Sequence, residues 1–131
     1  MLEVEEECFE PWLRYDASVF DYYYKRSSIF RVAKCNGVVV GYVLADLEGP
    51  YCHIVSIAVK PGYRGRGIGS RLLNQALVEC KNAGATRAYL EVSTANKPAL
   101  RLYSKAGFRV VGVIKGYYGR EDAYIMVKDI S

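Results

Sequence analysis

The chain has 131 residues and a formal net charge of +4. This length suits a single core, so we expect residues 1–131 to form one domain. The positive residues are dispersed rather than gathered into a basic face, which argues against a nucleic-acid partner. The chain has no uninterrupted apolar run long enough to cross a membrane, and its N-terminus is acidic rather than signal-like, so we expect no membrane partner.

The first half of the chain reads as two short helices and three strands. The expected helices are Leu2–Phe9 and Ala17–Lys25, and the expected strands are Ile29–Cys35, Val38–Ala45 and Cys52–Val59. Asn36 and Gly37 separate the first two strands, and Asn-Gly is the preferred two-residue hairpin turn.

The third of these strands runs into a loop with three glycines, Arg64-Gly65-Arg66-Gly67-Ile68-Gly69. An amphipathic segment, Ser70–Ala83, follows directly and is expected to be helical. Glycines let backbone N–H groups point into one concavity, and a helix N-terminus adds its positive dipole end. The loop is no P-loop, because no Lys-Ser or Lys-Thr pair follows, and its glycine spacing is not that of a Rossmann fingerprint. These features indicate a site for a diphosphate group.

The second half of the chain continues the alternation of strands and helices. Alternating apolar and polar residues predict a strand over Thr86–Val92. A short helix is expected over Pro98–Ala106, ended by Gly107, and two closing strands over Val110–Ile114 and Ala123–Val127. The sequence therefore predicts an α/β fold with a mixed sheet.

The cysteines show no paired short spacing, so the sequence supports neither a zinc site nor a CxxC redox motif. We interpret them as reduced core thiols of a cytoplasmic protein and expect no metal. They are Cys8, Cys35, Cys52 and Cys80.

A second motif block follows the glycine loop at a fixed interval. It consists of Leu90-Glu91-Val92, then Asn96-Lys97-Pro98-Ala99-Leu100-Arg101-Leu102-Tyr103, then Gly107-Phe108. Taken with Ile57-Ala58-Val59 and the loop at 64–69, this block resembles the GNAT superfamily of acetyl-coenzyme A-dependent N-acetyltransferases. The resemblance runs from about Cys8 to Ile130. It implies a mixed, mostly antiparallel sheet splayed at its centre, with helices on both faces.

Three further segments resemble the protein N-terminal acetyltransferases of the archaeal and ribosomal-protein-alanine type. They are Cys52-His53-Ile54-Val55-Ser56-Ile57, Leu90-Glu91-Val92, and Gly116-Tyr117-Tyr118 with Glu121-Asp122-Ala123-Tyr124. One departure is that the family's first strand has no room before Leu2. A free edge at Ile29–Cys35 would follow, with three outcomes open: a homodimer, a shortened edge or a truncated gene start.

The resemblance implies three catalytic residues. Glu91 is the expected base, since strand geometry turns it away from Leu90 and Val92; the alternative is an ordinary exposed glutamate. His53 shares the basic role in archaeal members, although its spacing also suits a packed or surface histidine. Tyr103 matches the family's general acid, against the alternative of a core aromatic.

The resemblance also implies how acetyl-coenzyme A (acetyl-CoA) is held. The diphosphate lies on the amides of a segment matching Arg64, Gly65, Arg66, Gly67, Ile68 and Gly69. The coenzyme arm pairs with a segment matching Ile57, Ala58 and Val59, and backbone N–H groups near Val59 are expected to stabilise the oxyanion. Asn96 and Tyr103 complete the predicted coenzyme contacts, although Asn96 equally suits a helix N-cap.

The acceptor is expected between two loops. Tyr117 and Tyr118 match a tyrosine pair that grips a peptide N-terminus, and Phe9 and Glu10 lie in the loop lining the first side chain. The alternatives are an aromatic turn and a surface loop. The predicted function is acetyl transfer by direct attack, in a ternary complex, from acetyl-CoA to the N-terminal α-amine of proteins, with ribosomal proteins as a candidate class. A lysine or small-amine acceptor, or a coenzyme-binding module without turnover, stays open.

Overall fold

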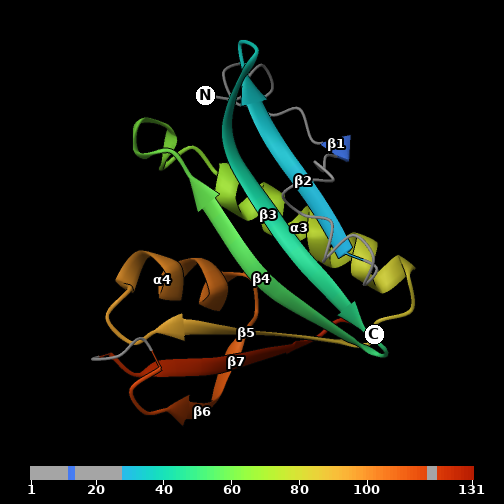
Figure 1. The fold of residues 1–131 in the computed structure, drawn as a ribbon, viewed down its shortest axis with the longest axis vertical. Helices are drawn as coiled ribbons and strands as arrows, with labels where there is room; N and C mark the ends of the chain where they lie inside the picture. The colour runs from blue at the N-terminus through green and yellow to red at the C-terminus, as the bar shows by residue number, and fades with distance from the viewer. Residues whose placement is uncertain (1–11, 14–27, 118–120) are drawn as a thin grey trace.

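The computed structural model describes residues 12–13, 28–117 and 121–131. In this part of the chain the strands form one seven-stranded sheet with the order β1-β2-β3-β4-β5-β7-β6 (Figure 1). Among the described strands, only β4 and β5 pair in parallel; every other neighbouring pair is antiparallel. The predicted fold class, a mixed and mostly antiparallel sheet with helices, is confirmed. The strands are β1 (Trp12–Leu13), β2 (Ser28–Cys35), β3 (Val38–Glu48), β4 (Tyr51–Val59), β5 (Arg87–Ser93), β6 (Arg109–Ile114) and β7 (Ala123–Asp129).

The hairpin between β2 and β3 has the predicted two-residue turn. Asn36 and Gly37 both have positive φ, 54° and 80°, as the twist of a tight hairpin requires. β3 continues to Glu48, beyond the predicted end at Ala45, and a second two-residue turn joins it to β4. The long β3 therefore places Glu48 opposite Tyr51 at the far end of the sheet.

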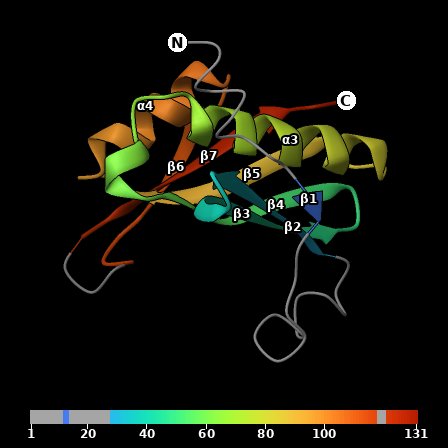
Figure 2. The same cartoon turned by 90° about the horizontal axis from the view of Figure 1, so that it is seen from above.

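Two helices, α3 (Ile68–Asn82) and α4 (Lys97–Lys105), cover one face of the sheet (Figure 2). A short 3-10 turn, η1 (Pro61–Tyr63), precedes α3. The predicted apolar stripe of α3 is confirmed, because it is buried against the strands. Its members are Ile68, Leu72, Leu73, Ala76, Leu77 and Cys80.

Alternation along β5 separates the core from the opposite face. Ala88, Leu90 and Val92 are buried in the core, whereas Tyr89 and Glu91 are half-buried on the other face. The two helices predicted before β2 fall on residues outside the described ones. In the described part of the chain, neither helix has the length and apolarity needed to span a bilayer.

The edge of β2 is partly covered, which corrects the prediction of a free edge there. The two residues of β1 pair antiparallel with the middle of β2, Trp12 opposite Val32 and Leu13 opposite Arg31. The pairing comes from a segment that does not read as a strand, because a two-residue strand has no periodicity to detect.

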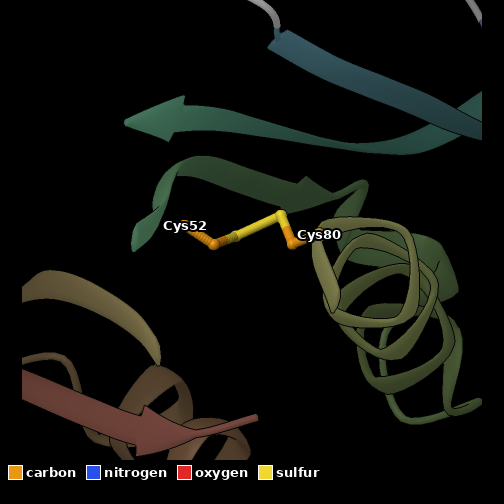
Figure 3. The surroundings of a disulfide bond; sticks show 2 residues. All are labelled: Cys52 and Cys80. Atoms are coloured by element: carbon orange, nitrogen blue, oxygen red, sulfur yellow. A yellow bond between two sulfur atoms is a disulfide. The ribbon is translucent and has the colours of Figure 1, made fainter. Parts of the chain in front are cut away.

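The prediction of reduced thiols is wrong for the cysteines that the structure describes. Cys52 on β4 and Cys80 on α3 form a disulfide, with their Cα atoms 6.0 Å apart (Figure 3). Both are fully buried, and Cys35 is disulfide-bonded as well. Cys8 lies outside the described residues. Packing of α3 on β4 joins cysteines separated by 28 positions, a pairing that local spacing cannot reveal. Cysteine usage therefore no longer supports a cytoplasmic location.

Candidate active site

The sheet opens between its two parallel strands. β4 and β5 pair only from Tyr51 to His53 and from Arg87 to Tyr89 in the described chain. Beyond these residues the strands diverge, as Figure 1 shows. A bulge adds to the divergence, since Leu44 pairs with Ser56 and Ala45 with Ile54, which leaves Val55 without a partner in the ladder. The segment Ile57–Val59 thus has one edge facing the opening, where an extended ligand could pair.

The glycine loop lies between the open end of β4 and α3. Gly65 and Gly67 both have φ of 80°, in the left-handed region that favours glycine. Gly67 is the N-cap of α3 and, having no side chain, leaves the first-turn N–H groups without a side-chain cap. A Cβ built on Gly65 would meet nothing within 4 Å, so the loop borders open space.

The two loop arginines are held in defined places. Arg64 donates from Nε to the carbonyl oxygen of Val59, at 3.1 Å. The Arg66 guanidinium lies over the ring of Tyr63, 5.1 Å from its centroid. Uncapped helix amides beside two cations, next to open space, fit a diphosphate, so the residues present are consistent with a coenzyme A site.

A histidine and a glutamate meet at the start of the opening. His53 is the last residue of β4 paired with β5, and its ladder partner is Tyr89. Glu91 lies two residues beyond Tyr89 on β5, on the same face of the sheet. The His53 Nε2 atom is 2.8 Å from the Glu91 Oε1 atom. Both side chains are about one-fifth exposed, which leaves them within reach of a ligand. The structure therefore brings together the two predicted basic residues.

Two residues that the sequence analysis missed complete this cluster. The Tyr89 ring stacks on His53, with centroids 4.5 Å apart and planes 2° apart. Tyr89 also donates its hydroxyl to Glu48 Oε1 at 2.6 Å. The other Glu48 oxygen, Oε2, lies 3.8 Å from His53 Nδ1. Tyr89 shares its predicted face with Glu91, and that alternation is the signal that could have found it.

Burial raises the pKa of Tyr89 well above its ordinary value, and the hydrogen bond to Glu48 raises it further. The phenol is therefore a stable donor at neutral pH. A pocket of about 420 Å³ adjoins the cluster. It is lined by Glu48, Tyr51, Arg87, Tyr89, Ile125 and Val127.

The predicted residues of α4 are placed as follows. Tyr103 is buried, 7% exposed, with its ring edge-on to Phe108 at 5.9 Å. Asn96 is the N-cap of α4, and its Oδ1 atom accepts from the Ala99 N–H at 3.2 Å. The N-cap interpretation of Asn96 is confirmed. The coenzyme roles of both residues stay predictions.

The turn between β6 and β7 carries the predicted acceptor residues. Tyr117, the third residue after the end of β6, is 46% exposed. The turn is held by Asp122, whose Oδ1 atom accepts from the Gly116 N–H at 3.0 Å. That bond lowers the pKa of the Asp122 carboxyl, and Lys115 lowers it further. Phe9, Glu10 and Tyr118 lie outside the described residues. Within the described ranges, no group of His, Cys, Asp and Glu is placed to hold a metal ion.

Known proteins resemble this chain in sequence and in fold. The model of the acetyltransferase (GNAT) family matches residues 1–108. An N-alpha-acetyltransferase of Sulfurisphaera tokodaii is 40% identical over 111 residues, which are 74% of this chain and 66% of that protein. The chain thus spans about two thirds of that relative.

Two solved structures superpose on nearly the whole chain. Ard1 from Thermoplasma volcanium has a TM-score of 0.79 at 25% identity, covering 100% of this chain and 94% of that one. The ribosomal-protein-S18-alanine N-acetyltransferase from Escherichia coli has a TM-score of 0.78 at 26% identity, covering 98% and 84%. These matches confirm the resemblance that the two motif blocks indicate.

Proposed function

This chain belongs to the acetyltransferase (GNAT) family, and from that premise we propose that it transfers acetyl from acetyl-CoA to the N-terminal α-amino group of proteins. The predicted enzyme class, an acetyl-CoA-dependent N-acetyltransferase, agrees with the family and with the names of the relatives. The choice of acceptor and the roles of individual residues are the proposal.

The contact between His53 and Glu91 carries this proposal. An α-amine has a pKa of roughly 7.7 to 8.0, so much of it is protonated at neutral pH and cannot attack. A base that takes the proton as the nitrogen attacks removes this obstacle. Glu91 accepts that proton directly or through one water, and His53, whose Nε2 atom is 2.8 Å away, shares the proton with it.

The open end of β4 and the glycine loop would hold the thioester. Amides at Arg64–Gly69 would bind the diphosphate, and the open edge of Ile57–Val59 would pair with the coenzyme arm. When bound, acetyl-CoA supplies an acyl carbon that accepts the amine and a thiolate that leaves. Backbone N–H groups near Val59 would stabilise the oxyanion.

The assignment of Tyr103 is also part of the proposal. Its phenol would orient the coenzyme sulfur or protonate the thiolate. Since a phenol has a pKa of about 10 and a thiol about 8.5, proton donation from Tyr103 runs uphill and orientation is the larger expected contribution. Asn96 uses Oδ1 for its capping bond, and its amide N–H₂ group would donate to the coenzyme arm.

A matched peptide panel tests the acceptor. One peptide has a free N-terminus and no lysine, a second has a blocked N-terminus and one lysine, and a third has both groups free. Mass spectrometry after incubation with acetyl-CoA should find acetyl on the first peptide and only on the N-terminus of the third. Acetylation of the second peptide with none on the first would overturn the proposal. Tight coenzyme binding with no product on any amine would identify a binding module without turnover.

A further inference from the structure

The His53 side chain is contacted on three sides by residues from two other strands. Glu91 on β5 faces Nε2, Tyr89 on β5 covers the ring face, and Glu48 on β3 faces Nδ1. A fourth ionisable residue, Asp46 on β3, is the ladder partner of His53. Only the Glu91 contact belongs to the predicted catalytic set.

We propose that Glu48 and Tyr89 act together as positioning residues, which orient His53 so that Nδ1 holds the imidazole proton and Nε2 is the nitrogen that shares with Glu91 the proton taken from the amine. The kinetic part rests on the proposed function, since it requires that His53 and Glu91 take up the amine proton. The orientation itself does not, because it concerns the resting protein.

The hydroxyl of Tyr89 supplies the first constraint. Its 2.6 Å bond to Glu48 Oε1 fixes the carboxylate in one rotamer and leaves Oε2 turned toward Nδ1. At 3.8 Å the Oε2 to Nδ1 separation is longer than a hydrogen bond, so Glu48 acts by charge. A carboxylate at this distance favours a proton on the nitrogen that faces it.

The stacked ring supplies the second constraint. With the planes 2° apart, Tyr89 prevents the imidazole from tilting out of the line between the two carboxylates. A ring flip would place carbon atoms where the nitrogens now face Glu91 and Glu48. The partner on one ring nitrogen decides the state of the other nitrogen. Because Nδ1 keeps its own proton throughout, the proton taken from the amine comes to rest on the Glu91 and His53 Nε2 side.

The chain contains a single histidine, which makes a direct spectroscopic test feasible. Long-range ¹H–¹⁵N correlation spectra of ¹⁵N-histidine-labelled protein report the protonation of Nδ1 and Nε2 separately. In the wild type we expect a protonated Nδ1. In Glu48→Gln, which keeps an oxygen acceptor for Tyr89 but loses the charge, we expect the Nδ1 signal to move toward that of an unprotonated nitrogen.

The kinetic readout separates positioning from binding. In Glu48→Gln we expect kcat to fall by about tenfold or more, the lower end of what the loss of an orienting partner costs at metal-bound histidines, with KM for acetyl-CoA unchanged. Tyr89→Phe keeps the stacked ring and loses the hydroxyl, so its effect should be smaller and in the same direction. Since Tyr89 acts partly through Glu48, the double variant should lose less than the product of the two single losses. Asp129→Asn, which removes an exposed carboxylate at the end of β7, is the charge control.

Two outcomes would overturn the proposal. One is a folded Glu48→Gln protein whose histidine signals and kcat match the wild type. The other is a rise in KM for the acceptor peptide with kcat and histidine signals unchanged, which would make Glu48 an acceptor-binding residue of the adjoining pocket. Should the wild type acetylate no amine, the proposed function fails, while the histidine spectra still decide whether Glu48 holds the Nδ1 proton.

Discussion

The two ends of β4 differ in what their neighbours provide. Among the residues that the structure describes, Tyr51–His53 pairs with β3 on one side and β5 on the other, whereas Ile57–Val59 pairs with β3 alone. At the paired end, side chains are fixed by one another, as the contacts among Glu48, Tyr89, His53 and Glu91 show. At the open end, backbone groups and uncapped helix amides are left for a ligand.

This difference explains why the proposed chemistry is placed at His53. It is the last paired residue of β4, so its backbone is held by two neighbours while its side chain reaches the opening. A site on paired strands keeps its geometry, and a site beside an opening admits a substrate. His53 meets both conditions.

The largest expected effect is on kcat, when the two proposed basic residues are replaced and the open end of β4 is left unchanged. In the double variant His53→Gln and Glu91→Gln, kcat should fall by roughly 10²- to 10⁴-fold, the usual contribution of general acid–base catalysis. Acetyl-CoA affinity should change little, because the glycine loop is untouched. Steady-state kinetics and calorimetric titration with acetyl-CoA measure the two quantities. Unchanged turnover would remove both residues from the mechanism.

The features that could be predicted from the sequence are those whose geometry is set by residues close together in the chain. The orientation of Glu91 away from Leu90 and Val92 follows from strand alternation, and the buried stripe of α3 follows from its helical period. The turn at Asn36 and Gly37 follows from the same kind of local rule. These features hold because their geometry is set within one element.

Contacts between elements that lie far apart in the chain could not be predicted from the sequence. Glu48 lies beyond the predicted end of its strand, so nothing indicated that the hairpin would carry it to His53. The disulfide depends on how α3 packs on β4, and the sequence spacing of Cys52 and Cys80 does not predict that packing. The short β1 likewise required its partner strand to define it.

The disulfide gives the next largest effect, because it fixes the paired end to α3. Loss of a crosslink that closes a loop of 28 positions should lower the free energy of unfolding by about 3–4 kcal/mol. Chemical denaturation of Cys52→Ala, Cys80→Ala and the double variant measures this. Either single variant removes the whole crosslink, so the double variant should be little worse than either one. A double loss equal to the sum of the singles would instead assign the stability to side-chain packing.

The smallest expected effect is on acetyl-CoA affinity, when Gly65 at the open end of β4 is replaced. Gly49 provides a matched control. Gly65 and Gly49 both have positive φ, 80° and 63°, and a Cβ on either would meet nothing within 4 Å. An alanine at either position should therefore cost a similar amount of stability, about 1–2 kcal/mol, from the left-handed backbone. Gly49 lies in the β3–β4 turn, far along the strand from the glycine loop, so Gly49→Ala should bind acetyl-CoA as the wild type does.

Gly65→Ala should differ from this control only in ligand binding. Its Cβ would project into the space that the diphosphate is proposed to fill, and we expect acetyl-CoA affinity to fall about tenfold, or about 1.4 kcal/mol. Calorimetric titration of both variants, with their unfolding curves measured in parallel, makes the comparison. Equal affinity in the two variants would mean that the amides at the start of α3 do not hold the diphosphate. The two ends of β4 would then differ only in how firmly their side chains are held, and not in ligand binding.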